Sequence, residues 1–330
     1  MSALASKTVA SDEASARPSA VLAAELPARW GRLQRLKNGV IYVVLRAVHG
    51  LLAALPFRLA EALCVALGAL AGVVAVGERR RALVHLAQAL PELGPAAHHR
   101  IVRAMFVHFG RSLAELTHMD RFVDGPHAVR LSDAQRALFD AALAEGKGAV
   151  AVTGHIGNWE LLAQVVARAG YPTTTIAKPL YDPRLTRWVH AARTRFGLGV
   201  IWRGDSAASK EMLGVFRKKA MLALLIDQDT RVQGAFVPFF GRPAHTPTAA
   251  ASLALRFQAP VVVSWAHRVG GRHELHVERL DVQPTGNDEA DTLALTAELN
   301  RRLEGAIRAH PEQWVWMHRR WKQRPPVEVA

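Results

Sequence analysis

The sequence predicts an α/β fold, with a largely parallel sheet covered by helices and hydrophobic helices before it at the N-terminus. From Ser132 onward, short apolar runs rich in β-branched residues alternate with helical stretches, as in a sheet whose parallel strands are joined by helices. Apolar residues make up 50% of the 330 residues, which is enough for a large core. Two apolar runs, Val40 to Leu55 and Ala62 to Val76, precede this region.

These runs divide the chain into three parts. Residues 1–30 are rich in Ala and Ser and lack the apolar centre of a secretory signal, so we expect a flexible tail. Residues 31–78 carry both apolar runs, and we expect a membrane-associating helical region there. Residues 79–330 are expected to form the main α/β domain.

The first apolar run is amphipathic. Arg46 lies near its middle, where a charge costs about 2.5–3.5 kcal/mol in a bilayer, so a simple membrane span is not expected. At about 100° per residue, the polar side chains share one face of a helix. These polar residues are Arg35, Asn38, Tyr42, Arg46 and His49. The pattern is typical of a helix that lies in the membrane interface.

The second run is uncharged but shorter than the roughly 20 residues that a bilayer demands. It is equally compatible with a helix of the core. Packing of both helices on the α/β domain is therefore the alternative to docking on a membrane.

From Ser132 the elements follow in order. Ser132 and Gln135 form a capping box, which begins a helix that stops at Gly146. Strands are expected at Ala149–Thr153, Thr173–Ala177, around Val200, at Met221–Ile226, Val261–Trp265 and, as an alternating edge strand, Arg272–Leu280. Helices are expected at Trp159–Ala169, Pro183–Phe196, Ser206–Lys218, Thr248–Phe257 and Asp291–His310.

Composition narrows the classes of partner. Lys and Arg number 42 against 28 acidic residues, and the formal charge of +14 favours anionic partners such as acidic lipids, an acidic carrier protein or nucleic acid. A nucleic-acid role is disfavoured, because the basic residues are scattered and no recognition motif is present. The one cysteine, Cys64, favours a reducing compartment. No Gly-x-Ser-x-Gly elbow of a hydrolase is present.

The segment from Gly154 to Glu160 carries the candidate chemistry. It follows a predicted strand and opens a predicted helix, and α/β sheets bind ligands at the carboxyl ends of their strands. His155 can act as a general base whose tautomer a carboxylate fixes, and Glu160 is the expected carboxylate. The same spacing recurs at His273/Glu278 and His276/Asp281, but an alternating strand puts those side chains on opposite faces.

The segment His155–Glu160 resembles the catalytic motif of the bacterial lipid A biosynthesis acyltransferases, the lauroyl and myristoyl transferases, within the wider lysophospholipid acyltransferase-like group. Two later blocks also resemble signatures of that family. They are Val237–Gly241 with Thr246, and Pro311–Gln313 with the basic and aromatic segment up to Lys322. The resemblance covers residues 40–325, and it implies that residues 79–330 are an acyltransferase domain.

The resemblance implies roles for individual residues. His155 is the base and Glu160 its partner, and no metal or cofactor is implied. The substrate-binding candidates are Asn158, Arg195, Arg203, Asp229 and Arg319, where Arg195 and Arg203 are alternatives for one arginine. Asp227 and Asp229 can also be read as loop carboxylates that balance arginines, or as an aspartate-x-aspartate metal motif.

The expected function is therefore acyl transfer. The donor is acyl carrier protein or acyl-CoA, and the acceptor is a hydroxyl of a phosphorylated lipid A precursor at the cytoplasmic face of the cell inner membrane. An enzyme that acylates a lysophospholipid or another glycolipid with the same residues is the alternative. A basic binding protein without activity is the third reading.

Overall fold

The computed structural model describes residues 19–325 of the chain, and within them six strands form the main sheet in the order β3-β2-β4-β1-β7-β8. The strands are β1 (Ala149–Thr153), β2 (Thr173–Ala177), β3 (Gly199–Trp202), β4 (Met221–Leu225), β7 (Val261–Val269) and β8 (Arg272–Leu280). Every neighbouring pair is parallel except β7 and β8, which pair antiparallel at the edge. The predicted fold class is confirmed.

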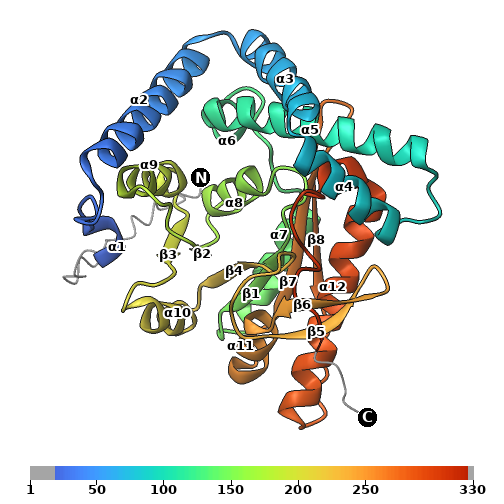
Figure 1. Ribbon diagram of the computed structural model, residues 1–330. Coiled ribbons are helices and arrows are strands. Elements are labelled where there is room, and N and C mark those ends of the chain that lie inside the picture. The colour runs from blue at the N-terminus through green and yellow to red at the C-terminus, as the bar shows by residue number, and fades with distance from the viewer. Residues whose placement is uncertain (1–18, 326–330) are drawn as a thin grey trace, which may run out of the picture.

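Helices cover both faces of this sheet (Figure 1). The helices are α4 (Val76–Ala89), α5 (Pro95–Thr117), α6 (Met119–Val123), α7 (Asp133–Ala144), α8 (Trp159–Arg168), α9 (Pro183–Thr194), α10 (Ala208–Arg217), α11 (Ala249–Phe257) and α12 (Asp288–Ala309). Helices α7 and α8 enclose one buried cluster with the sheet, and α4, α5, α10, α11 and α12 enclose the other. The parallel strands are therefore buried on both faces of the sheet, which explains why their sequences are nearly continuous runs of apolar residues.

Most predicted elements are found at their expected places. The Ser132–Gln135 capping box is formed, and β1, β2 and β8 have the predicted bounds. A hairpin of β5 (Gly234–Phe239) and β6 (Arg242–Pro247) was not predicted. Its strands contain three prolines, which argue against a strand in sequence, and it is held in place by packing against α12.

The N-terminal part is more closely joined to the domain than the sequence suggests. Residues 1–18 of the predicted tail lie outside the described residues. In the remainder, Ala20–Ala23 forms α1, and Trp30 is buried and stacks on Tyr181. The predicted boundary at residue 78 falls inside α4.

Helix α3 (Phe57–Val74) crosses α5 at close range. Small residues every four positions form the face that meets α5, namely Ala60, Cys64, Gly68 and Gly72. A side chain on Gly68 would collide with the carbonyl of Phe106, and one on Gly110 would collide with the carbonyl of Cys64. The two backbones therefore touch, and α3 belongs to the folded domain.

Helix α2 (Arg32–Ala54) shows the predicted division into two faces. On the polar face, Arg46 lies 5.3 Å from the ring centre of Trp188, and Arg184 lies 4.8 Å from that of Tyr42, so this face meets α9. The apolar side chains on the other face are exposed, as are leucines of α3. Within the described residues, α2 and α3 are the two helices long and apolar enough to cross a membrane, and both lie at one end of the molecule (Figure 1).

Replacement of Gly110 tests the contact between α3 and α5. Gly110→Leu should lower the melting temperature, because overpacking a close contact costs about 1–3 kcal/mol. Thermal unfolding in detergent measures the effect, and Gly50→Ala is the matched control because nothing lies within 4 Å of the added methyl group. An unchanged melting temperature for Gly110→Leu would show that the helices do not touch.

Candidate active site

His155 lies two residues beyond the end of β1, and its ring contacts the carboxylate of Asp227. Strands β1 and β4 pair in register, with Thr153 opposite Leu225, so residues 155 and 227 follow the two strands at equivalent positions. Nδ1 of His155 lies 2.8 Å from Oδ1 of Asp227, and the His155 backbone N–H donates to Oδ2 at 2.7 Å. The parallel register thus brings a base and a carboxylate together.

The Asp227 side chain is completely buried yet ionised. Burial alone would raise its pKa, but the His155 ring, its backbone N–H and the indole N–H of Trp314, which donates at 2.8 Å, outweigh burial and lower the pKa to about 2. A carboxylate in that state accepts hydrogen bonds only, so Nδ1 of His155 carries a proton and donates. Nε2 is the nitrogen left to accept a proton from a substrate.

The turn after His155 approaches β7 closely. Gly157 has φ +58°, and a side chain there would collide with the carbonyl of Ala266. The Gly157 N–H donates to Gln313 at 2.8 Å, and the Asn158 N–H donates to Ala266 at 3.2 Å. Only glycine fits this conformation and this contact, which explains its place in the motif.

The predicted contact between His155 and Glu160 is corrected by the structure. Glu160 lies in the first turn of α8 and forms an ion pair with Arg193 of α9, while Asp227 takes the place against the His155 ring. Asp227, and not Glu160, is therefore the carboxylate that contacts Nδ1 of His155. Both His155 and Glu160 nevertheless line the same cavity.

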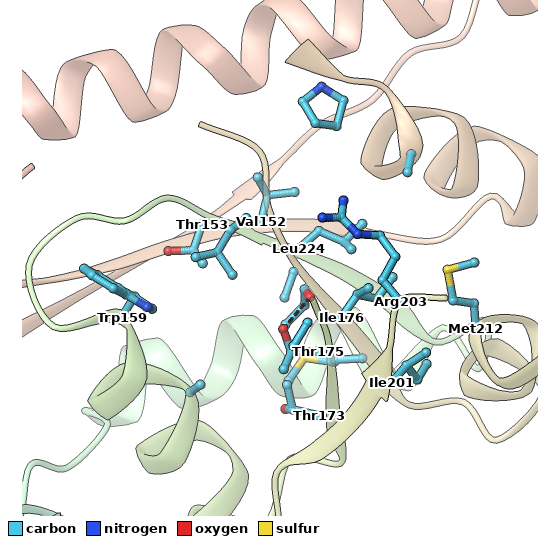
Figure 2. A pocket seen from close by; sticks show the side chains of 18 of the residues that line it. Val152, Thr153, Trp159, Thr173, Thr175, Ile176, Ile201, Arg203, Met212 and Leu224 are labelled. Atoms are coloured by element: carbon cyan, nitrogen blue, oxygen red, sulfur yellow. Dashed lines mark hydrogen bonds between the residues drawn. The ribbon is translucent and has the colours of Figure 1, made fainter. Parts of the chain in front are cut away.

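The cavity has a volume of about 740 Å³, within the range of small-molecule sites. His155, Trp159 and Arg203 line the cavity near the carboxyl ends of the strands, the part that we call its mouth. Trp159 and Arg203 lie on opposite sides of the pocket (Figure 2). The sheet and helices α7, α8, α10 and α11 all contribute to its lining. Between the sheet and α7 and α8, in its inner part, the lining includes the buried side chains of Phe139, Leu162, Val166 and Met221. The mouth is therefore polar and basic, whereas the inner part is mostly apolar.

The predicted substrate-binding residues lie in different places in the structure. Of these residues, Arg203 alone lines the cavity. Arg195 is exposed and pairs with Asp120 at 2.8 Å, whereas Arg193, two residues earlier, lines the cavity together with Arg203. Asn158 is buried at the start of α8, where its side chain accepts from the N–H of Leu161 at 3.0 Å.

Asp229 and Arg319 also lie away from the cavity lining. The Asp229 carboxylate accepts from the backbone N–H of Gln323 at 2.7 Å and so holds the C-terminal segment. Arg319 is exposed, and Arg320 is the buried residue, donating to Thr246 at 2.7 Å. Asp227 and Asp229 thus bind different partners, His155 with Trp314 and Gln323 respectively. These partners are not the arginines that the loop-carboxylate interpretation expected.

The family model described as "Bacterial lipid A biosynthesis acyltransferase" matches residues 31–323. The chain belongs to this family. It is 27% identical to a lipid A biosynthesis acyltransferase of Haemophilus influenzae, over 81% of this chain and 83% of the relative. It is 24% identical to the lipid A biosynthesis myristoyltransferase of Escherichia coli K12, over 83% of this chain and 84% of the relative.

Relatives with another acceptor also match. The chain is 27% identical to a phosphatidylinositol mannoside acyltransferase of Mycobacterium tuberculosis over 55% of its length, and the match spans 57% of that relative. These relatives are all named as acyltransferases, and so is the family. The chain therefore belongs to a family of enzymes that transfer acyl groups.

The sequence did not predict the roles of two residues of this candidate site, Asp227 and Arg193. Asp227 follows β4 as His155 follows β1, and this parallel was visible in the sequence. However, only the strand order makes β4 the neighbour of β1. Arg193 lies on α9, one helical turn before the predicted end of that helix, and nothing in its local sequence distinguishes it from Arg195.

The buried carboxylate predicts a pH dependence of stability. The folded-state pKa of Asp227 is about 2, below the value of about 3.9 in an unfolded chain, so its contribution is present above pH 4 and is lost as the pH falls toward 2. The difference in free energy of unfolding between wild type and Asp227→Asn should therefore shrink over that window, as measured by urea unfolding.

Other carboxylates titrate in both proteins and cancel in this difference. Asp281→Asn, at an exposed position, is the control and should show no comparable change. A difference that is the same at pH 6 and pH 3 for Asp227→Asn would contradict an ionised Asp227.

Proposed function

We propose that this protein transfers a fatty acyl chain from a thioester donor to a hydroxyl group of a phosphorylated lipid A precursor, at the cytoplasmic face of the inner membrane. The observation that carries the proposal is the His155–Asp227 pair at the mouth of an apolar cavity, in a member of a family described by this chemistry. Acyl carrier protein or acyl-CoA is the donor.

His155 acts as the general base. Its Nε2 takes the proton of the acceptor hydroxyl as the hydroxyl oxygen attacks the thioester carbonyl carbon. The carbon–sulfur bond then breaks, and the same proton passes to the departing sulfur, so that an ester and a free thiol result. Asp227 stays ionised throughout and stabilises the positively charged imidazolium ring.

The start of α8 stabilises the oxyanion of the tetrahedral intermediate. The N–H groups of Gly157 and Asn158 are bonded to backbone carbonyls and that of Leu161 to its cap, so the amides of Trp159 and Glu160 are available. Both point along the positive end of the helix dipole, where a developing negative charge is favoured.

Glu160 acts through Arg193. Their ion pair holds the guanidinium group in the cavity wall, where it and Arg203 present positive charge at the mouth. An anionic group of a substrate, such as a phosphate, would bind there. Glu160 therefore remains a proposed catalytic-site residue, but as a positioning residue for Arg193 and not as the partner of His155.

The inner cavity takes the acyl chain. Ala151 and Ala223 lie side by side on β1 and β4, in register, and leave room between the sheet and α8. Thr173 and Met221 are buried lining residues at the starts of β2 and β4, the ends of those strands opposite to His155. A linear apolar chain with its thioester at His155 would extend along this slot.

The relatives suggest two classes of acceptor lipid. The lipid A enzymes among the relatives favour a lipid A precursor, whereas the mycobacterial relatives favour a mannosylated phosphatidylinositol. Both are phosphorylated glycolipids, which suits the basic mouth. Mass spectrometry of the product with each acceptor, and with a lysophospholipid as a third, distinguishes them.

Removal of the base tests the proposed chemistry. His155→Ala should lower kcat by about 10²–10⁴ while the protein remains folded, because the hydroxyl proton then has no positioned acceptor. The assay measures thiol release and the acylated product by mass spectrometry. His99→Ala, at an exposed position on α5, is the matched control and should behave as wild type. Wild-type turnover by folded His155→Ala would exclude the mechanism.

Filling the slot tests the place of the acyl chain. Ala223→Leu should reduce kcat/KM for long acyl donors more than for short ones, because the added atoms occupy the middle of the slot. A series of acyl-CoA donors of increasing length measures the preference. Ala290→Leu, on the exposed start of α12, should leave the series unchanged. An equal loss at all chain lengths would place the chain elsewhere.

Membrane association is tested on the exposed face of α3. The side chains of Leu63, Leu67 and Leu70 are 44%, 54% and 56% exposed. Their joint replacement by Glu should abolish co-sedimentation with vesicles of phosphatidylethanolamine and phosphatidylglycerol, because charge on this face opposes burial in lipid. Leu293→Glu, on α12, is the control. A triple variant that still binds vesicles would rule out this face as the membrane contact.

A further inference from the structure

A buried ion pair lies behind the turn that carries His155. Arg268 of β7 donates to Glu115 of α5 through Nε at 3.0 Å and through Nη2 at 2.6 Å. The two side chains are only 8% and 5% exposed. His273 of β8 donates to the same carboxylate at 2.9 Å, and none of these three residues lines the cavity.

One arm of this cluster reaches Asn158. The Asn158 amide donates to Oε2 of Glu115 at 2.7 Å, while its oxygen accepts from the N–H of Leu161 and caps α8. Because an amide offers both a donor and an acceptor, Glu115 sets the orientation of the side chain that begins α8. The first turn of α8 then carries Trp159 and Glu160 into the cavity wall.

A second arm reaches Gly157 through His108. Arginine only donates, so Nη1 of Arg268 donates to Nδ1 of His108 at 2.8 Å. The proton of His108 is therefore on Nε2, which donates to the carbonyl of Gly157 at 3.1 Å. Burial, followed by the charge of Arg268, lowers the pKa of His108 to about 4, which keeps the ring neutral and this tautomer in place near pH 7.

Helix α5 supplies both arms from one face. His108 and Glu115 are seven residues apart, which is two helical turns. Gln313 completes the frame, since its side chain accepts from the N–H of Arg268 at 2.8 Å and donates to the Arg268 carbonyl at 2.9 Å. Two consecutive residues of the active-site turn are thus fixed from behind by one charged pair.

Stability alone is a weak reason for such a pair. Desolvation of two charges offsets much of their attraction, and replacement of a buried pair by apolar residues is often neutral or stabilising. Charged side chains do, however, impose a geometry that apolar ones do not, because their hydrogen bonds are directional. We propose that Glu115 and Arg268 are positioning residues for acyl transfer, which hold the Gly157–Asn158 turn so that His155 and the start of α8 face the substrate.

This inference rests on the proposed role of His155, and two variants test it. Glu115→Leu/Arg268→Met replaces the pair by apolar side chains of similar length and should keep a melting temperature near that of wild type. Its kcat should nevertheless fall about 10²-fold, the scale of an ångström-sized misplacement, with the KM for acyl-CoA unchanged. Asn158→Ser, which keeps a helix cap but removes the donor to Glu115, should show the same loss in kcat with less disturbance of the core.

Asn287→Ser is the matched control, because Asn287 caps α12 in the same way and its side chain accepts from the N–H of Ala290 at 3.1 Å. It should leave kcat unchanged. Wild-type kcat in a folded double variant and in Asn158→Ser would overturn the proposal, as would losses in kcat that only follow losses in melting temperature. If the double variant does not fold, Asn158→Ser decides alone. His155→Ala in the same assay separates the two hypotheses. An active His155→Ala would reject the base and with it this inference, whereas an inactive His155→Ala with wild-type kcat in the double variant and in Asn158→Ser would reject only the role of the pair.

Discussion

The buried charge of Asp227 is the interaction on which the arrangement of this site depends. An ionised carboxylate without exposure needs hydrogen-bond donors, and here they come from the His155 ring, the His155 backbone and Trp314. These three donors join the ends of two neighbouring strands to the C-terminal segment. The requirement explains why the aromatic C-terminal residues fold back on the core, where Trp314 also bridges to Ile156. Because Nδ1 of His155 contacts Asp227, Nε2 is left to accept a proton.

The turn after His155 lies between two layers of buried charge. Asp227 contacts His155, the first residue of the turn. On the other side, Glu115 contacts Asn158 directly, and Arg268 reaches Gly157 through His108. Little freedom remains for the base or for the first amides of α8. Such preorganisation is how an enzyme avoids the cost of reorienting dipoles during a reaction. The Glu160–Arg193 pair differs, since its side chains are 19% and 23% exposed and face the cavity, where a ligand can reach them.

Helix α5 connects the apolar end of the molecule to the site. Its Gly110 meets α3, whose opposite face exposes leucines, and its His108 and Glu115 hold the active-site turn. Helices α2 and α3 therefore cannot be removed without consequence for the rest of the fold. Their removal would uncover one face of α5, the helix whose His108 and Glu115 contact Gly157 and Asn158.

The sequence by itself determined the local elements and indicated His155 as the candidate base. Periodicity, caps and glycines located nearly every strand and helix after Ser132, and the resemblance of three short blocks indicated the family and His155. The sequence did not determine which side chains contact one another in the site. Glu160 is near His155 in sequence, yet Asp227, 72 residues away, contacts the ring. Arg193, Glu115 and Arg268 were likewise not predicted, nor was the β5–β6 hairpin. The physical reason is that spacing along a chain governs local hydrogen bonds and faces, whereas the partner of a side chain depends on which strands and helices pack together. Only the strand order β4-β1-β7 and the packing of α5 against β7 and β8 decided those partners.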